Sequence, residues 1–221
     1  MKRYLPILII AGVLAAAIAP VAVMLRTDKP KTVLMTQPSP STPSNTDGPV
    51  NVNGASVTVE EFGDYQCPPC GHLHPEMKKI ENDYGSRVRF VFRNLPLVSL
   101  HKNALLAAEA AEAARLQDRF ELMHDRLYES QAEWTDEGNP RPTFIRYAGE
   151  LGLNTDRFDR DMDGPTVKQR LAEDQQRADS FGVRGTPTVF VEGQEIKSEH
   201  TNGDDIRRGI DYMLRAKGGK P

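Results

Sequence analysis

The feature that most constrains this chain is a pair of cysteines, Cys67 and Cys70, the only two in its 221 residues. The β-branched, nearly alternating segment 56–62 precedes them and predicts a strand, and the residues after them predict a helix to about Tyr84. Cys67 would then lie at a helix N-terminus, where free N–H groups and the helix dipole stabilise a thiolate. Cys70 follows one turn later on the same face. The pattern predicts a redox-active pair with Cys67 as nucleophile and Cys70 as resolving thiol.

Three other interpretations of the pair remain open. It could be a structural disulfide, although so short a loop gives a chain-entropy gain of only about 2 kcal/mol. It could bind a metal ion together with His72 or His74, although the sequence has no second CxxC motif. It could also consist of two inert thiols. His72 and His74 are themselves expected to be partly exposed helix residues.

The remaining patterns predict an α/β fold with a large helical insertion. Segment 87–92 alternates cleanly and would complete a strand–helix–strand unit, although Pro75 predicts a kink or an early break in its helix. A third strand is expected at 188–191 and a last helix at about 204–216. Between the second and third strands, helices are predicted at about 103–116, 118–130, 143–151, 156–162 and 165–181. Because a simple crossover needs only about a dozen residues, the stretch from about 100 to 182 is interpreted as an inserted helical subdomain.

Two segments of different composition precede this domain. Two basic residues stand before an uncharged run that reaches the roughly 20 residues a spanning helix needs, so residues 1–27 are predicted to be a membrane anchor or a signal peptide. Residues 28–49 are rich in Pro, Ser and Thr and are predicted to be a flexible linker, with the folded domain at 50–217. Basic residues flank the apolar run on both sides and leave its orientation open. The formal net charge of −3 does not indicate a nucleic-acid partner.

Two motifs resemble the DsbA-like branch of the thioredoxin superfamily: VEEFGDYQCPPC at residues 59–70 and FGVRGTPT at residues 181–188. The second is similar to the loop of that family that carries a cis-proline and packs against the active-site cysteines. The resemblance extends over about residues 50–216. It implies a thioredoxin-like fold whose helical insertion is the one that distinguishes the DsbA-like branch.

The resemblance also implies roles for individual residues. Pro187 would follow a cis peptide bond, and Thr186 would offer backbone groups to an extended substrate peptide while its side chain modulates the thiolate. Glu61 matches an acidic residue that lies buried beneath the active site and assists proton transfer. The alternatives are an ordinary turn before the third strand and, for Glu61, a solvated carboxylate at a strand end.

The residues between the cysteines depart from the family pattern. Strong oxidants of the family often have histidine before the second cysteine, where this chain has Pro69. With proline at this position, the positive charge that a histidine could carry and one backbone N–H are both missing near the Cys67 sulfur. Pro69 also disfavours helical geometry at the preceding residue, Pro68. The disulfide is therefore expected to be less oxidising than a version with histidine.

The predicted function is thiol–disulfide exchange with exported proteins, with the chain acting as oxidant and without a cofactor. The alternatives are a reductase or isomerase on the same scaffold, or a membrane-tethered metal-binding module that uses Cys67, Cys70 and a nearby histidine. We expect a monomer in the cell envelope, outside the cytoplasm, whose partners are exported thiols or disulfides and a membrane protein that resets the cysteine pair. A single close pair of cysteines fits an exported enzyme, because no other thiol can mispair with its substrates.

Overall fold

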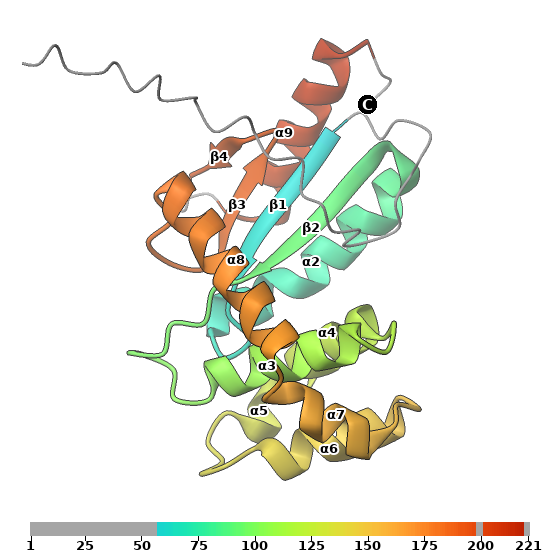
Figure 1. Cartoon of the computed structure of the whole chain (residues 1–221). Coiled ribbons are helices and arrows are strands. Elements are labelled where there is room, and N and C mark those ends of the chain that lie inside the picture. Colours follow the sequence, from blue (N-terminus) through green and yellow to red (C-terminus); the bar gives the residue numbers. More distant parts are fainter. Residues whose placement is uncertain (1–56, 198–200, 219–221) are drawn as a thin grey trace, which may run out of the picture. The chain divides into compact units, whose positions relative to one another are not determined.

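A mixed four-stranded sheet and a block of helices make up the part of the chain described by the computed structural model, residues 57–197 and 201–218 (Figure 1). The predicted anchor or signal peptide at 1–27 and the linker at 28–49 lie outside the described residues. Among those described, no helix is both long and apolar enough to cross a membrane. The elements are β1 (Val57–Gly63), α2 (Pro68–Tyr84), the short 3₁₀ helix η1 (Gly85–Arg87), β2 (Val88–Asn94), α3 (Ala104–Arg115), α4 (Phe120–Glu129), α5 (Gln131–Trp134), α6 (Arg141–Glu150), α7 (Thr155–Met162), α8 (Pro165–Phe181), β3 (Thr188–Val191), β4 (Gln194–Ile196) and α9 (Gly203–Ala216).

The sheet has the strand order β2-β1-β3-β4. β1 pairs with β2 in parallel and with β3 in antiparallel orientation, and β4 pairs antiparallel with β3. Successive side chains of a strand point to opposite faces, so Val57 and Val59 face one side and Phe62 the other. The two valines share a core with residues of α2 and α9, whereas Phe62 packs against Ala178 of α8. Helices therefore cover both faces of the sheet (Figure 1).

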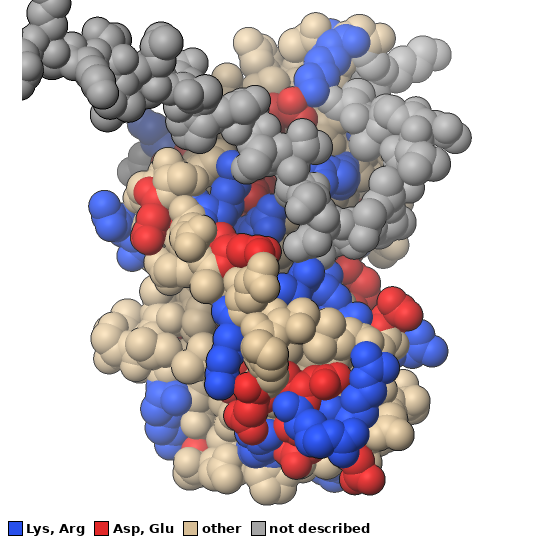
Figure 2. All heavy atoms as spheres, in the orientation of Figure 1, with Lys and Arg blue, Asp and Glu red and all other residues tan. Residues whose placement is uncertain are grey.

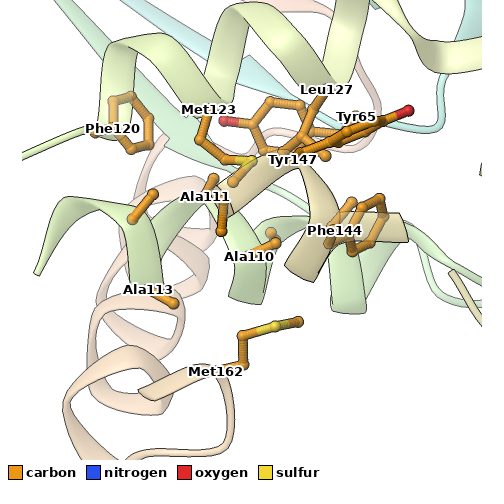
Figure 3. Packing of buried hydrophobic residues seen from close by; sticks show 14 of the residues in the cluster. Tyr65, Ala110, Ala111, Ala113, Phe120, Met123, Leu127, Phe144, Tyr147 and Met162 are labelled. Atoms are coloured by element: carbon orange, nitrogen blue, oxygen red, sulfur yellow. The ribbon is translucent and has the colours of Figure 1, made fainter. Parts of the chain in front are cut away.

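Helices α3 to α8 lie between β2 and β3 in the chain and have a core of their own. Alanines line α3 on most sides, and Ala107, Ala110 and Ala111 are fully buried. Their small side chains let α3 pack closely against α4, α6, α7 and α8, whose larger residues such as Met123 and Phe144 fill the space around it (Figure 3). The arrangement is the α/β fold with helical insertion that the sequence predicts.

The predicted elements are confirmed with small shifts at their ends, and three short elements were not predicted: η1, α5 and β4. The prediction of an early break at Pro75 is wrong, because α2 continues unbroken to Tyr84. Pro75 lies on the exposed side of α2, where the carbonyl that loses its helical partner can reach water.

A buried polar network joins the sheet to the inserted helices. Arg93 of β2 lies 2.9 Å from a carboxylate oxygen of Glu60 on β1 and 3.1 Å from one of Asp174 on α8. The side-chain amide of the neighbouring Asn94 donates to Asp174 and to Glu112 of α3. On the surface, by contrast, positive and negative side chains are intermixed over the inserted helices in the view of Figure 2.

Candidate active site

Cys67 and Cys70 lie at the start of α2, directly beyond the end of β1. Cys67 is the N-cap residue, and Pro68 and Pro69 occupy the first two helical positions, where a missing N–H costs little. Both cysteines are free thiols. Cys67 is 5% exposed and Cys70 is completely buried, whereas the two prolines between them are exposed. The cysteine that reaches the surface is therefore the first of the pair.

The two thiols differ sharply in acidity. The pKa of Cys67 is lowered to about 6, chiefly because the Cys70 thiol donates a hydrogen bond to its sulfur. The Thr186 hydroxyl and the backbone N–H of Cys70 lower it further, against the opposing effects of burial and the Asp64 charge. The pKa of Cys70 is raised, first by burial and then by its interaction with Cys67. At neutral pH the pair therefore holds one thiolate, on the more accessible sulfur.

The loop before β3 packs against Cys67. The peptide bond between Thr186 and Pro187 is cis, as the resemblance implies. The Cys67 sulfur lies 3.4 Å from the Thr186 carbonyl oxygen, and in its protonated form Cys67 donates a hydrogen bond to this oxygen. The Thr186 hydroxyl is buried and makes no hydrogen bond with any residue described. It lies close enough to Cys67 to lower the pKa of that thiol, so it is placed to donate to the thiolate.

Asp64 organises the loop between β1 and α2. Its buried carboxylate accepts hydrogen bonds from the backbone N–H of Gln66 and of Leu97, at 2.8 and 2.9 Å. It also lies 2.8 Å from Nδ1 of His101. These contacts join the segment after β2 to the loop that leads into Cys67, and that segment exposes Val98 and Leu100. No local pattern relates residues so far apart in sequence.

Glu61 is buried at the end of β1, on the sheet face that α2 covers. It points to the same side as Val59, whereas Glu60 points the other way, toward Arg93. Burial, and to a smaller extent the charge of Glu81, raises the pKa of Glu61 to about 8. Both carboxyl groups line a cavity of about 140 Å³ between α2, β2 and α4. Glu61 is therefore a carboxyl group that can hold a proton at neutral pH.

The two histidines after the cysteines differ, and the expectation that both are partly exposed is wrong for one of them. His72 is exposed, but His74 is buried against Tyr128, with ring centres 5.0 Å apart. His74 lies one turn after Cys70, on the side of α2 that faces α4. Within residues 57–197 and 201–218, neither cysteine belongs to a group of three side chains placed to bind one metal ion. The geometry therefore does not favour the metal site built on the cysteine pair.

Comparison with known proteins relates the chain to thioredoxin-like oxidoreductases. A family model described as thioredoxin matches residues 52–211. A thioredoxin-like oxidoreductase from Silicibacter pomeroyi is 31% identical with a TM-score of 0.61, over 72% of this chain and 87% of that one. BdbD from Bacillus subtilis is 28% identical with a TM-score of 0.65, over 74% and 90%. DsbA from Xylella fastidiosa, at 21% identity, a TM-score of 0.63 and coverage of 75% and 89%, supports the fold alone.

Curated relatives match over a shorter stretch. A protein named Na(+)/H(+) antiporter NhaA 3 from Salinispora tropica is 44% identical over 140 residues, which are 63% of this chain and 21% of the antiporter. The antiporter NhaA 1 from Mycolicibacterium gilvum is 33% identical over 144 residues, 63% of this chain and 22% of that protein. The chain thus spans about a fifth of the length of these relatives, and their transport activity is not carried over to it.

Proposed function

The chain belongs to the DsbA-like branch of the thioredoxin superfamily, and from this premise we propose that it donates the Cys67–Cys70 disulfide to exported proteins. The observation that carries the proposal is the lowered pKa of Cys67. A stabilised thiolate favours the reduced form of the pair, and a pair that favours its reduced form is an oxidant toward other thiols.

The reaction consists of two exchanges. A substrate thiolate attacks the Cys67 sulfur of the oxidised pair, which forms a mixed disulfide and releases Cys70 as a thiolate. Glu61 supplies a proton to Cys70, whose raised pKa favours the thiol. A second substrate thiolate then attacks the substrate sulfur of the mixed disulfide, and Cys67 leaves as a thiolate. The substrate dithiol loses two electrons, and the cysteine pair gains them.

Thr186 and Pro187 would hold the substrate chain during the exchange. The Thr186 carbonyl lies next to the Cys67 sulfur, so an extended peptide that pairs with this loop would bring its own sulfur to the reactive one. Exposed Pro68, Pro69 and Leu100 offer apolar surface nearby, which suits unfolded chains that still expose their own apolar residues.

The setting of the enzyme follows from the chemistry. Disulfides persist in oxidising compartments, so we place the domain outside the cytoplasm, as a monomer held near the membrane by the predicted N-terminal segment. A membrane redox partner must remove the two electrons after each cycle. A reductase or an isomerase on the same scaffold would instead require that the pair be kept reduced.

The deciding experiment measures the reduction potential of the Cys67–Cys70 pair by equilibration against glutathione buffers. A value toward about −120 mV supports a disulfide donor, and a value toward about −270 mV supports a reductant. The Cys70→Ala variant should accumulate a mixed disulfide between Cys67 and a substrate thiol, because the resolving sulfur is absent. A pair that fails to equilibrate with glutathione would contradict any exchange activity.

A further inference from the structure

A second cluster of reactive side chains lies where α2 packs against α4, one helical turn beyond Cys70. It consists of His74 from α2 and the neighbouring residues His124 and Asp125 from α4, and one ligand atom of each lies within 4.8 Å of the others. From this geometry we infer that His74, His124 and Asp125 bind a divalent transition-metal ion such as Zn²⁺. The site is separate from the cysteine pair and is independent of the proposed disulfide exchange.

The distances suit an ion held between the three groups. Nε2 of His74 lies 3.4 Å from Oδ1 of Asp125, which is about the separation of two ligand atoms that each lie about 2.1 Å from a tetrahedral zinc ion. This Oδ1 atom is buried and accepts no hydrogen bond from any residue that the structure describes. A buried carboxylate oxygen without a donor is costly, and a metal ion would remove that cost.

The surroundings orient the ligands as metal sites require. The Tyr65 hydroxyl oxygen lies 2.9 Å from Nδ1 of His124. In the tautomer in which Nδ1–H donates to this oxygen, the ring is held in place and Nε2 is unprotonated and able to bind an ion. Such a contact to the second ring nitrogen is usual for histidines that bind metals. His74 is held in turn by its stacking on Tyr128. Both histidines line the cavity of about 140 Å³ beneath the sheet edge, which provides an entry path and space for a water ligand.

The ligand set and its neighbours select the class of ion. Two imidazoles and one carboxylate suit Zn²⁺ and related transition metals, whereas Ca²⁺ and Mg²⁺ prefer oxygen ligands alone. Lys78 is the opposing group, because its Nζ atom lies 3.1 Å from Oδ2 of Asp125. It occupies the other carboxylate oxygen and leaves Oδ1 to the ion. Its charge must nevertheless weaken the binding of a cation, so removing it should increase affinity.

The test is a calorimetric titration of the full chain with Zn²⁺, without a polyhistidine tag and with Cys67 and Cys70 oxidised so that no thiolate competes. We expect one Zn²⁺ per chain, at least tenfold weaker binding in Asp125→Asn, and tighter binding in Lys78→Ala. His72→Ala, which removes an exposed histidine two residues from His74, is the matched control and should bind as the parent does. Co²⁺ in place of Zn²⁺ should give the visible absorption of a tetrahedral site.

Three results would overturn the inference. One is the absence of saturable one-to-one binding to the parent chain. Another is equal affinity in the parent, Asp125→Asn and Lys78→Ala. The third is loss of binding in His72→Ala, which would assign the ion to surface histidines. Because Asp125 is partly exposed and asparagine keeps its shape, the decisive variant does not depend on a change in the buried aromatic cluster.

Discussion

The two prolines between the cysteines determine how many donors reach the Cys67 sulfur. They occupy the first two positions of α2, so the N–H groups that a helix N-terminus normally directs at an anion are absent there. The thiolate depends instead on the Cys70 thiol, the Thr186 hydroxyl and the backbone N–H of Cys70. A residue that restores an N–H, a positive charge or both should stabilise it further.

Pro69→His should therefore make the disulfide more oxidising. The substitution returns a backbone N–H and adds an imidazole close to the Cys67 sulfur, and both favour the reduced, thiolate form. We expect the reduction potential to rise by at least about 30 mV, a tenfold change in the exchange equilibrium. Equilibration with glutathione buffers measures it directly.

Pro69→Ala is the matched control, because it restores the N–H without the imidazole. It should raise the potential by less than Pro69→His does. If neither variant raises the potential, the missing donors do not limit the stability of the Cys67 thiolate.

At the scale of residues, the sequence predicts site residues where short motifs carry the signal. The cysteine spacing and the GTPT segment pointed to Cys67, Cys70, Thr186 and Pro187, which the structure brings together. It did not identify Asp64 or its contact with His101, because that contact depends on the path of the chain after β2. His74 was assigned the wrong exposure because α4, against which it packs, could not be placed from the sequence.

At the scale of elements, strand alternation fixes the environment of Glu61. Val57, Val59 and Glu61 share one face of β1, so the carboxyl group is enclosed beneath α2. Its pKa is raised to about 8 in the folded chain, whereas an unfolded chain would titrate it near the ordinary value of 4.5. The folded state binds this proton more tightly, so the contribution of Glu61 to stability is greatest below about pH 4.5 and is lost as the pH rises through about 8.

Glu61→Gln should consequently stabilise the protein at pH 8.5 by a few kcal/mol and have little effect at pH 4. Urea denaturation at the two pH values, with the cysteines kept reduced, measures the difference. Glu129→Gln changes an exposed carboxylate of α4 and should alter stability little at either pH. An equal effect of Glu61→Gln at both pH values would show that Glu61 does not titrate in the buried state assigned to it.

The alanines of α3 set how closely the inserted helices approach one another. Ala111 is completely buried in the core shown in Figure 3, so Ala111→Leu would force three extra carbon atoms into a filled space. We expect a loss of about 1–3 kcal/mol in the free energy of unfolding. Ala132→Leu, at an exposed position of α5, is the control and should cost less than about 0.5 kcal/mol. Equal costs at the two positions would mean that α3 is not tightly packed.

The elements themselves could be predicted where their ends have clear signals. Helix α8 begins at Pro165 and ends before Gly182, whose positive φ of 69° suits glycine, and its predicted bounds are correct. Strand β4 and helix α5 have three and four residues, too few for a periodic pattern to emerge. Their positions follow from pairing and packing with distant parts of the chain.

At the scale of the whole molecule, the polar network around Arg93 connects the sheet to the insertion. Its charged groups come from β1, β2, α3 and α8, and Arg93 is 9% exposed. Buried ion pairs add little over apolar packing, but a buried charge left without its partner is strongly destabilising. The network therefore specifies how the two halves of the fold fit together, because any displacement of α8 would separate Asp174 from Arg93.

Replacing Arg93 with methionine tests this role of the network. Methionine keeps an unbranched apolar stem but lacks the guanidinium, which leaves Glu60 and Asp174 buried with fewer donors, so Arg93→Met should cost about 3–5 kcal/mol in urea denaturation. Arg146→Met removes an exposed partner of Glu150 and should cost less than about 1 kcal/mol. Because the two carboxylates come from β1 and α8, the sheet and the helices of the destabilised variant should unfold together in one cooperative transition. A second, separate unfolding transition for helices α3 to α8 would mean that the network positions these helices on the sheet but does not couple their unfolding to that of the sheet.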